Sequence, residues 1–157
     1  MAFKVSEFYF PLISQRNNIL ITTDANQLYS AAKSGRLDVV QMLLSRDVSP
    51  NTSIDDGFTA LMTAAEAGHA EVVKVLANHP DCELSARNSY GQTALGFAAQ
   101  NNRVEAALAI IQARNGIADI EAKCGGGRTA AEVARTAGHN HLADVLAEAA
   151  RKAQVNN

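Results

Sequence analysis

Apolar residues recur in the same register four times along the chain. In each case they lie four, five, eight and nine residues after a Gly or an Asn, and these turn residues are Gly35, Gly68, Asn102 and Gly138. Such spacing places the apolar side chains on one face of a helix. The pattern therefore predicts four amphipathic helices whose buried faces are Val39, Val40, Leu43 and Leu44; Val72, Val73, Leu76 and Ala77; Ala106, Ala107, Ile110 and Ile111; and Leu142, Ala143, Leu146 and Ala147.

A shorter apolar run precedes each of these turn residues. Gly and Asn tolerate the left-handed backbone conformation, which ends a helix and allows the chain to reverse direction. Successive turn residues, from Gly35 to Gly138, are separated by 33, 34 and 36 residues. The pattern predicts a repeated unit of helix, tight turn and helix.

The residue types also repeat. Gly57-Phe58-Thr59-Ala60-Leu61 returns as Gly91-Gln92-Thr93-Ala94-Leu95 after 34 residues, and a weaker copy is Gly127-Arg128-Thr129. Self-similarity at this period indicates one supersecondary unit stacked several times. In each copy the Thr is positioned to cap the first helix with its hydroxyl.

The segment from Asp56 to Leu76 resembles an ankyrin repeat over nearly its whole length. The resemblance implies an all-α solenoid of about four stacked helix-turn-helix units with short β-turn fingers, over residues 24–150. We expect a capping repeat at 24–54, repeats at 55–88 and 89–124, and a C-terminal capping repeat at 125–150. Residues 1–23 lie outside the pattern, and residues 151–157 form a tail.

Several positions depart from the family's pattern. Ala60 and Ala94 replace the usual Pro at the start of the first helix, and Met62 and Gly96 stand in place of the usual His. In the last unit, Arg135 puts a charge on a face that an internal repeat buries. Terminal repeats need such a polar outer surface, so the first and last units are interpreted as caps.

The N-terminal segment is apolar. Phe3, Phe8, Tyr9 and Phe10 fall within its first ten residues, and Ile19-Leu20-Ile21 follows. Such a composition is unlike that of a solvated tail, so we expect residues 1–12 to be ordered. They either cover the open end of the first repeat or dock onto a partner or a second copy, so both a monomer and a dimer through this segment are considered, the monomer being the default.

Composition narrows the class of partner and the compartment. The 157 residues are 47% apolar, with a formal net charge of −2. Because nucleic-acid binding requires a dense basic face, we expect no nucleic-acid partner. No stretch approaches the ~20 apolar residues that cross a bilayer, and no secretory signal is evident. Cys82 and Cys124 do not form a disulfide framework, which favours a cytoplasmic location and leaves a nuclear one open.

The sequence offers little candidate chemistry. His139 and His141 do not share a helix face, and Ser30 and Lys33 lack the companion motifs of Ser-x-x-Lys enzymes. The Gly125-Gly126-Gly127 run could approach an anion through backbone amides, but no phosphate-binding motif surrounds it. We therefore expect no catalytic residue, no metal and no cofactor.

Asn51 has three interpretations. It begins a glycosylation sequon that matters only in a secretory protein. By the resemblance, it also stands where an oxygen-dependent hydroxylase modifies some ankyrin repeats. The interpretation we favour is structural, in which the side chain of Asn51 hydrogen-bonds its own turn.

The expected function is non-catalytic protein recognition on a concave surface. By the resemblance, the partner-facing positions flank each finger glycine or precede each turn: Lys33, Ser34, Asp55, Asp56, Phe58, Glu66, Arg87, Ser89, Tyr90, Gln92, Gln100, Asn101, Arg128 and Thr136. Phe58 and Tyr90 are expected to be exposed anchors on equivalent sides of neighbouring fingers, because large aromatic residues dominate interfaces. The alternatives are a regulator or inhibitor of a partner enzyme such as a kinase, and a small-molecule site at the loop from Gly125 to Arg128.

Overall fold

The structure of this protein is a computed structural model that describes residues 23–113 and 120–155. The apolar N-terminal segment, apart from Thr23, lies outside the described residues. The expectations placed on residues 1–12 therefore remain predictions.

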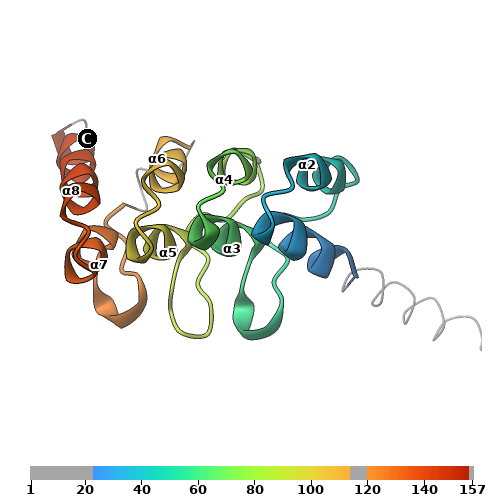
Figure 1. The fold of residues 1–157 in the computed structure, drawn as a ribbon, viewed down its shortest axis with the longest axis horizontal. Coiled ribbons are helices and arrows are strands. Elements are labelled where there is room, and N and C mark those ends of the chain that lie inside the picture. The colour runs from blue at the N-terminus through green and yellow to red at the C-terminus, as the bar shows by residue number, and fades with distance from the viewer. Residues whose placement is uncertain (1–22, 114–119, 156–157) are drawn as a thin grey trace, which may run out of the picture.

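The described helices form antiparallel pairs that stack side by side (Figure 1). A helix over residues 23–33 pairs with α2 (Leu37–Ser45), and α3 (Ala60–Ala67) pairs with α4 (Ala70–Ala77). Next come α5 (Ala94–Gln100) with α6 (Val104–Gln112), and α7 (Ala130–Thr136) with α8 (Asn140–Val155). The predicted all-α solenoid of four helix-turn-helix units is confirmed.

The units are arranged in three layers. The first helices, α3, α5 and α7, pack against one another, and the second helices, α2, α4 and α6, form the layer behind them. The fingers project from the opposite edge of the first helices (Figure 1). Their tips include the short 3-10 helices η1 (Asp55–Gly57) and η2 (Gly125–Gly127), which are closed by single bridges between Ser53 and Thr59 and between Cys124 and Arg128.

The predicted turn and cap residues adopt the expected geometry. Gly35, Gly68, Asn102 and Gly138 have φ values of 69°, 86°, 55° and 84°. Each finger Thr accepts a hydrogen bond from a backbone N–H in the first turn of the following helix, at 3.3 Å for Thr59, 3.2 Å for Thr93 and 3.3 Å for Thr129. Local sequence therefore fixes both the start and the end of the first helices.

The predicted apolar quartets make the core. Their members are buried except for Val39, Leu44 and Ala147, which are partly buried. The last helix extends further than expected: α8 continues to Val155, into the segment that the sequence analysis assigned to a tail. Near its end, Gln154 Nε2 donates to Glu121 Oε1 at 2.9 Å, which ties α8 to the loop before η2.

Neighbouring units are joined by a repeated side-chain contact to the backbone. In the second, third and fourth units, the residue that follows the turn residue contacts a backbone carbonyl oxygen of the preceding unit. That carbonyl belongs to the residue two positions before the turn residue of the preceding unit. His69 Nε2 lies 3.0 Å from Lys33 O, Arg103 Nε donates to Glu66 O at 3.0 Å, and His139 Nε2 lies 3.1 Å from Gln100 O. These contacts involve carbonyl groups at helix ends, which lack partners within the helix.

Candidate functional site

A pocket of about 520 Å³ lies between the third and fourth units. The fingers and the first helices of the two units form its walls. The residues that line it are Tyr90, Gln92, Gly96, Gln100, Cys124, Gly125, Gly126, Arg128, Val133, Thr136 and Ala137. The pocket thus combines an aromatic ring, two amides, a guanidinium group and small apolar residues.

Asn88 organises the finger that carries Tyr90. Its buried side chain accepts hydrogen bonds from Tyr90 N at 3.0 Å and from Gln92 N at 2.9 Å, and it donates to Gln92 Oε1 at 3.2 Å. The ring of Tyr90 remains 64% exposed, and its hydroxyl donates to Asp56 Oδ2 at 3.4 Å. The finger therefore holds the Tyr90 backbone rigidly and presents its ring to solvent.

The floor of the pocket exists because position 96 has no side chain. A Cβ at Gly96 would lie 2.9 Å from Cys124 Cβ and 3.1 Å from its Sγ. Cys124 is buried against α5, with Sγ 3.2 Å from Thr93 Oγ1. Burial raises the pKa of the Cys124 thiol, so this residue contributes apolar surface and is a poor nucleophile at neutral pH.

Arg128 is fixed on the opposite wall by Thr136. The guanidinium Nη1 donates to Thr136 Oγ1 at 3.2 Å, and that hydroxyl lies 2.7 Å from the carbonyl oxygen of Glu132. Arg128 is the only charged residue among those that line the pocket. The pocket is therefore positively charged on the side of the fourth unit.

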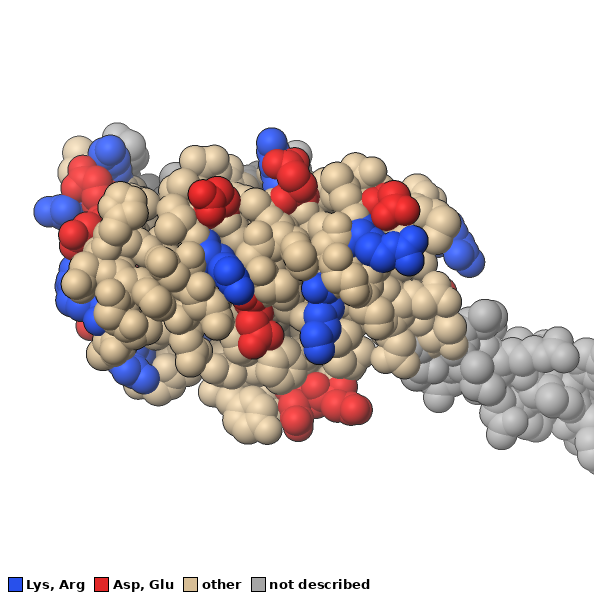
Figure 2. Space-filling view, in the orientation of Figure 1, with Lys and Arg blue, Asp and Glu red and all other residues tan. Residues whose placement is uncertain are grey.

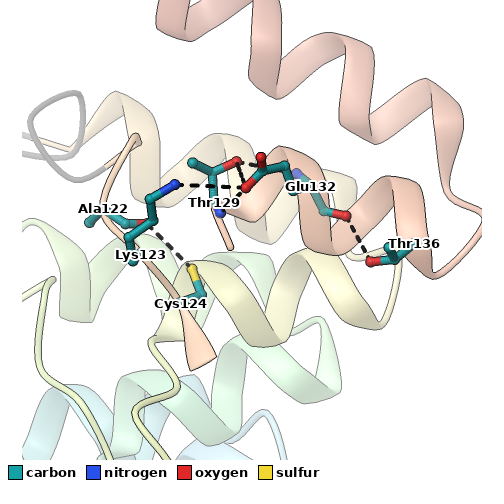
Figure 3. A network of polar contacts seen from close by, with 6 residues as sticks. All are labelled: Ala122, Lys123, Cys124, Thr129, Glu132 and Thr136. Carbon is teal, nitrogen blue, oxygen red and sulfur yellow. Dashed lines mark hydrogen bonds and ion pairs between the residues drawn. The ribbon is translucent and has the colours of Figure 1, made fainter. Parts of the chain in front are cut away.

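A capping box positions this wall (Figure 3). Thr129 N donates to Glu132 Oε2 at 2.7 Å, and Glu132 N donates to Thr129 Oγ1 at 3.3 Å. Lys123 Nζ lies 3.9 Å from the same carboxylate. The hydrogen bond from the Thr129 backbone is the main reason that the pKa of Glu132 is lowered. The start of α7, and with it Val133 and Thr136, is thereby fixed beside the finger.

The structure brings together some of the predicted site residues. Tyr90, Gln92, Gln100, Arg128 and Thr136 all line the pocket. Asp55 and Asp56 lie at the tip of η1, where Figure 2 shows acidic side chains gathered. Further predicted positions lie along the same fingers and turns, and Lys33 and Ser34 are exposed on the first unit.

Other predicted positions are engaged in hydrogen bonds within their own unit or with a neighbouring unit. Ser89 donates to Asp56 O from both its backbone N, at 2.8 Å, and its hydroxyl, at 3.0 Å. Arg87 Nη1 donates to Gly91 O at 3.4 Å, and Asn101 Nδ2 donates to Phe97 O at 2.9 Å. The carbonyl of Glu66 accepts the Arg103 contact described above. These residues have structural roles that the sequence analysis did not assign.

The prediction that Phe58 is an exposed ring is wrong. Phe58 is only partly exposed, packs against the hydrophobic core, and lies with its ring centroid 5.5 Å from that of Phe97. The two rings also occupy different repeat positions, because Phe58 corresponds to Gln92, whereas Tyr90 corresponds to Asp56. The residue after the finger glycine turns inward at Phe58, since an apolar ring gains from burial.

The favoured interpretation of Asn51 also needs correction. Its side chain does not bond its own turn but bridges to the loop after α4, donating from Nδ2 to Asp81 O at 2.6 Å and accepting at Oδ1 from Glu83 N at 2.9 Å. Asn51 therefore holds two neighbouring units together.

Two residues that shape the pocket were missed by the sequence analysis. Asn88 had a signal, because Asn followed by Ser-Tyr-Gly is typical of a turn closed by the Asn side chain. Gly96 was noticed as a departure from the repeat, but its consequence depends on Cys124, which is distant in sequence.

Over residues 23–113 and 120–155, no group of three or more His, Cys, Asp and Glu residues could hold a metal ion. No helix in this same part of the chain is long and apolar enough to span a membrane.

Comparison with known proteins gives consistent matches. The profile of the family described as "Ankyrin repeats (3 copies)" matches residues 28–124. The chain is 30% identical over 113 residues to Ankyrin repeat-containing protein P1E11.10 of Schizosaccharomyces pombe, a match that covers 72% of this chain and 52% of the yeast protein. It is 32% identical over 92 residues to Rabankyrin-5 of Mus musculus, covering 59% of this chain and 8% of that protein. A further match is to 26S proteasome non-ATPase regulatory subunit 10 of Dictyostelium discoideum, with 44% identity over 50 residues, 31% of this chain and 22% of that protein. The chain thus spans about half or less of the length of these relatives.

Proposed function

Because this chain belongs to the ankyrin repeat family, whose repeats are generally protein–protein interaction modules, we propose that it is a non-catalytic adaptor for another protein. The partner binds on the side of the fingers and first helices, with its main contact at the pocket between the third and fourth units. Binding residues concentrate on loops held by a rigid scaffold, and here the stacked helix pairs are that scaffold.

One observation carries this proposal. Five residues that the resemblance to ankyrin repeats marks as partner-facing line a single pocket: Tyr90, Gln92, Gln100, Arg128 and Thr136. They come from two fingers and two helices, so only folding assembles them. An exposed Tyr beside an Arg is the combination that interface anchors favour.

The decisive experiment compares two exposed side chains. Once a partner has been identified by affinity purification and mass spectrometry, we expect Tyr90→Ala to weaken binding by about 2 kcal/mol, or roughly thirtyfold. Met42→Ala is the matched control, because Met42 is 47% exposed on α2, in the first unit. Equal affinity of the wild type and a folded Tyr90→Ala variant would place the partner elsewhere. The identity of the partner also distinguishes an adaptor from a regulator or inhibitor of an enzyme.

The volume of the pocket supports a second candidate function, the binding of a small molecule. Ligand pockets occupy about 300–1,000 Å³, and the pocket at Gly125, Gly126 and Arg128 is within this range. A ligand that binds only the folded state raises the melting temperature. A screen of nucleotides and metabolites therefore tests this candidate, and a ligand whose stabilisation disappears in Arg128→Gln would support it.

A further inference from the structure

We propose that the pocket recognises an acidic side chain of the partner protein. The carboxylate pairs with Arg128, and an apolar side chain next to it in the partner's sequence rests on the floor formed around Gly96 and Cys124. This inference rests on the proposed function and specifies the chemistry of the segment that binds.

The first argument is that Arg128 has no ion-pair partner among the described residues. Arg36, Arg135 and Arg151 each lie within 4.0 Å of a carboxylate, at 3.7, 3.2 and 2.8 Å. The guanidinium of Arg128, in contrast, donates to the neutral hydroxyl of Thr136. A guanidinium presents five N–H donors in a planar fork that matches a carboxylate. The contact with Thr136 orients this fork and leaves further donors for a ligand.

The second argument concerns the charges that surround the pocket. No carboxylate is among the residues that line it. The nearby Glu132 carboxylate accepts a hydrogen bond from Thr129 N and lies 3.9 Å from Lys123 Nζ, and the charge of Arg128 is the smallest of the causes that lower the pKa of Glu132. A second cation, Arg87, is close enough for its charge to oppose partly the effect of burial on the pKa of Cys124. Two cations from neighbouring fingers therefore favour a negative group here.

The third argument sets the order of groups in the partner. Beside Arg128 the surface is apolar, with Cys124 buried and Val133 partly buried. On the far side of Tyr90 from Arg128 lie Asp55 and Asp56, at the tip of the finger of the second unit. A carboxylate is repelled there and attracted at Arg128, so the acidic residue of the segment lies toward the fourth unit.

The test begins with a random-peptide display library selected on the full chain. We expect the recovered peptides to share an Asp or Glu next to an apolar residue. Binding of the synthetic peptides is then measured by calorimetry to the wild type, to Tyr90→Ala, to Arg128→Glu and to Arg46→Glu. Arg46 is the control, because it is an exposed arginine in the first unit, outside the pocket. Binding should fall at least about tenfold in Arg128→Glu, since hydrogen bonds to charged groups are stronger than neutral ones, and should be unchanged in Arg46→Glu.

A charge exchange gives the sharper result. Replacing the acidic residue of the peptide by Lys should abolish binding to the wild type and restore binding to Arg128→Glu. Circular dichroism of each variant verifies that it is folded.

Three results would overturn the inference. The first is a selection that yields no acidic peptides. The second is that acidic peptides bind Arg128→Glu as tightly as they bind the wild type. The third is that peptides in which phosphoserine replaces the acidic residue bind more tightly than the original peptides. Peptides that depend on Tyr90 but not on Arg128 would remove this inference and leave the proposed function intact. Peptides whose binding depends on neither Tyr90 nor Arg128 would overturn both this inference and the proposed binding site.

Discussion

At the scale of single residues, burial separates two finger aromatics that look alike in the sequence. Tyr90 is 64% exposed, whereas Phe58 packs against Phe97 and the core. Aromatic pairs with centroids 4.5–7 Å apart are stabilising beyond their buried area. The same kind of side chain is therefore presented to solvent in one finger and contributes to the core in the neighbouring finger.

This difference predicts opposite outcomes for two truncations. Phe58→Ala should lower the free energy of unfolding by about 2 kcal/mol, less than the cost of removing a fully buried Phe. Tyr90→Ala should change it by about 0.5 kcal/mol or less, as surface substitutions usually do. Urea denaturation followed by circular dichroism measures both. Equal stabilities of the two variants would contradict the assignment of Phe58 to the core.

Because the thiol of Cys82 is largely buried, we expect the stability of the protein to decrease in the alkaline pH range. Burial, and secondarily the charge of Glu83, raises the pKa of this thiol from 9.0 to about 11. Above pH 9 the unfolded chain loses the thiol proton while the folded chain retains it, so ionisation favours the unfolded state. The contribution of Cys82 to stability is fully present below pH 9 and is lost as the pH rises toward 11.

The measurement is a comparison of melting temperatures between pH 8 and pH 11. Other groups titrate in this range, so Cys82→Ala is the control that isolates the thiol. The wild type should lose more stability than Cys82→Ala over this interval. Parallel curves for the two proteins would show that the thiol ionises with the same pKa in both states.

At the scale of elements, each turn serves both its own unit and the next one. Gly68 needs its left-handed conformation to end α3, and the side chain of Arg103 lies directly over it. A Cβ at Gly68 would be 2.7 Å from Arg103 Cδ, whereas a Cβ at Gly138 would meet nothing within 4 Å. The two glycines have nearly equal φ values, 86° and 84°, so they form a matched pair.

We expect Gly68→Ala to destabilise the protein more than Gly138→Ala. Both substitutions introduce backbone strain, but only the first displaces Arg103 from its hydrogen bond to Glu66 O. The difference in the free energy of unfolding should be about 1 kcal/mol, the usual net contribution of such a bond. Chemical denaturation of the two variants measures it, and equal losses would show that the Arg103 contact does not stabilise the stack.

At the scale of the whole molecule, charge is distributed unevenly along the row of fingers. Figure 2 shows acidic groups at the finger that contains η1 and a basic group at the finger beside α7. Asp55 and Asp56 belong to η1, and Arg128 directly follows η2. We expect this gradient to give a bound segment a preferred direction.

The gradient predicts that partner binding depends on salt. Charges near a surface are screened over about 10 Å at 0.1 M salt and about 3 Å at 1 M. Affinity for the partner should therefore fall as sodium chloride is added, and it should fall less for Arg128→Gln than for the wild type. Identical salt dependence for both proteins would mean that Arg128 does not face the partner's charge. Arg46→Gln, in the first unit and outside the pocket, is the control.

The sequence by itself determined the repeat, the helix pairs and the ends of the first helices. These features depend on short-range chemistry: apolar spacing on a helix face, left-handed turns at Gly35, Gly68, Asn102 and Gly138, and the caps at Thr59, Thr93 and Thr129. The resemblance of the sequence to ankyrin repeats also marked positions on the finger side, five of which line the pocket.

Only the tertiary structure decided which of those positions meet and which are buried. The pocket requires Gly96 on α5 to face Cys124 on the following finger, and the inward turn of Phe58 requires Phe97 on the next unit. Asn51 similarly finds its partners in a loop about thirty residues away. The periodicity of the sequence predicts the local conformation of a residue and the helix face on which it lies within its own unit. Contacts between units depend on the pair of residues that stacking brings together, and no single repeat contains that pair.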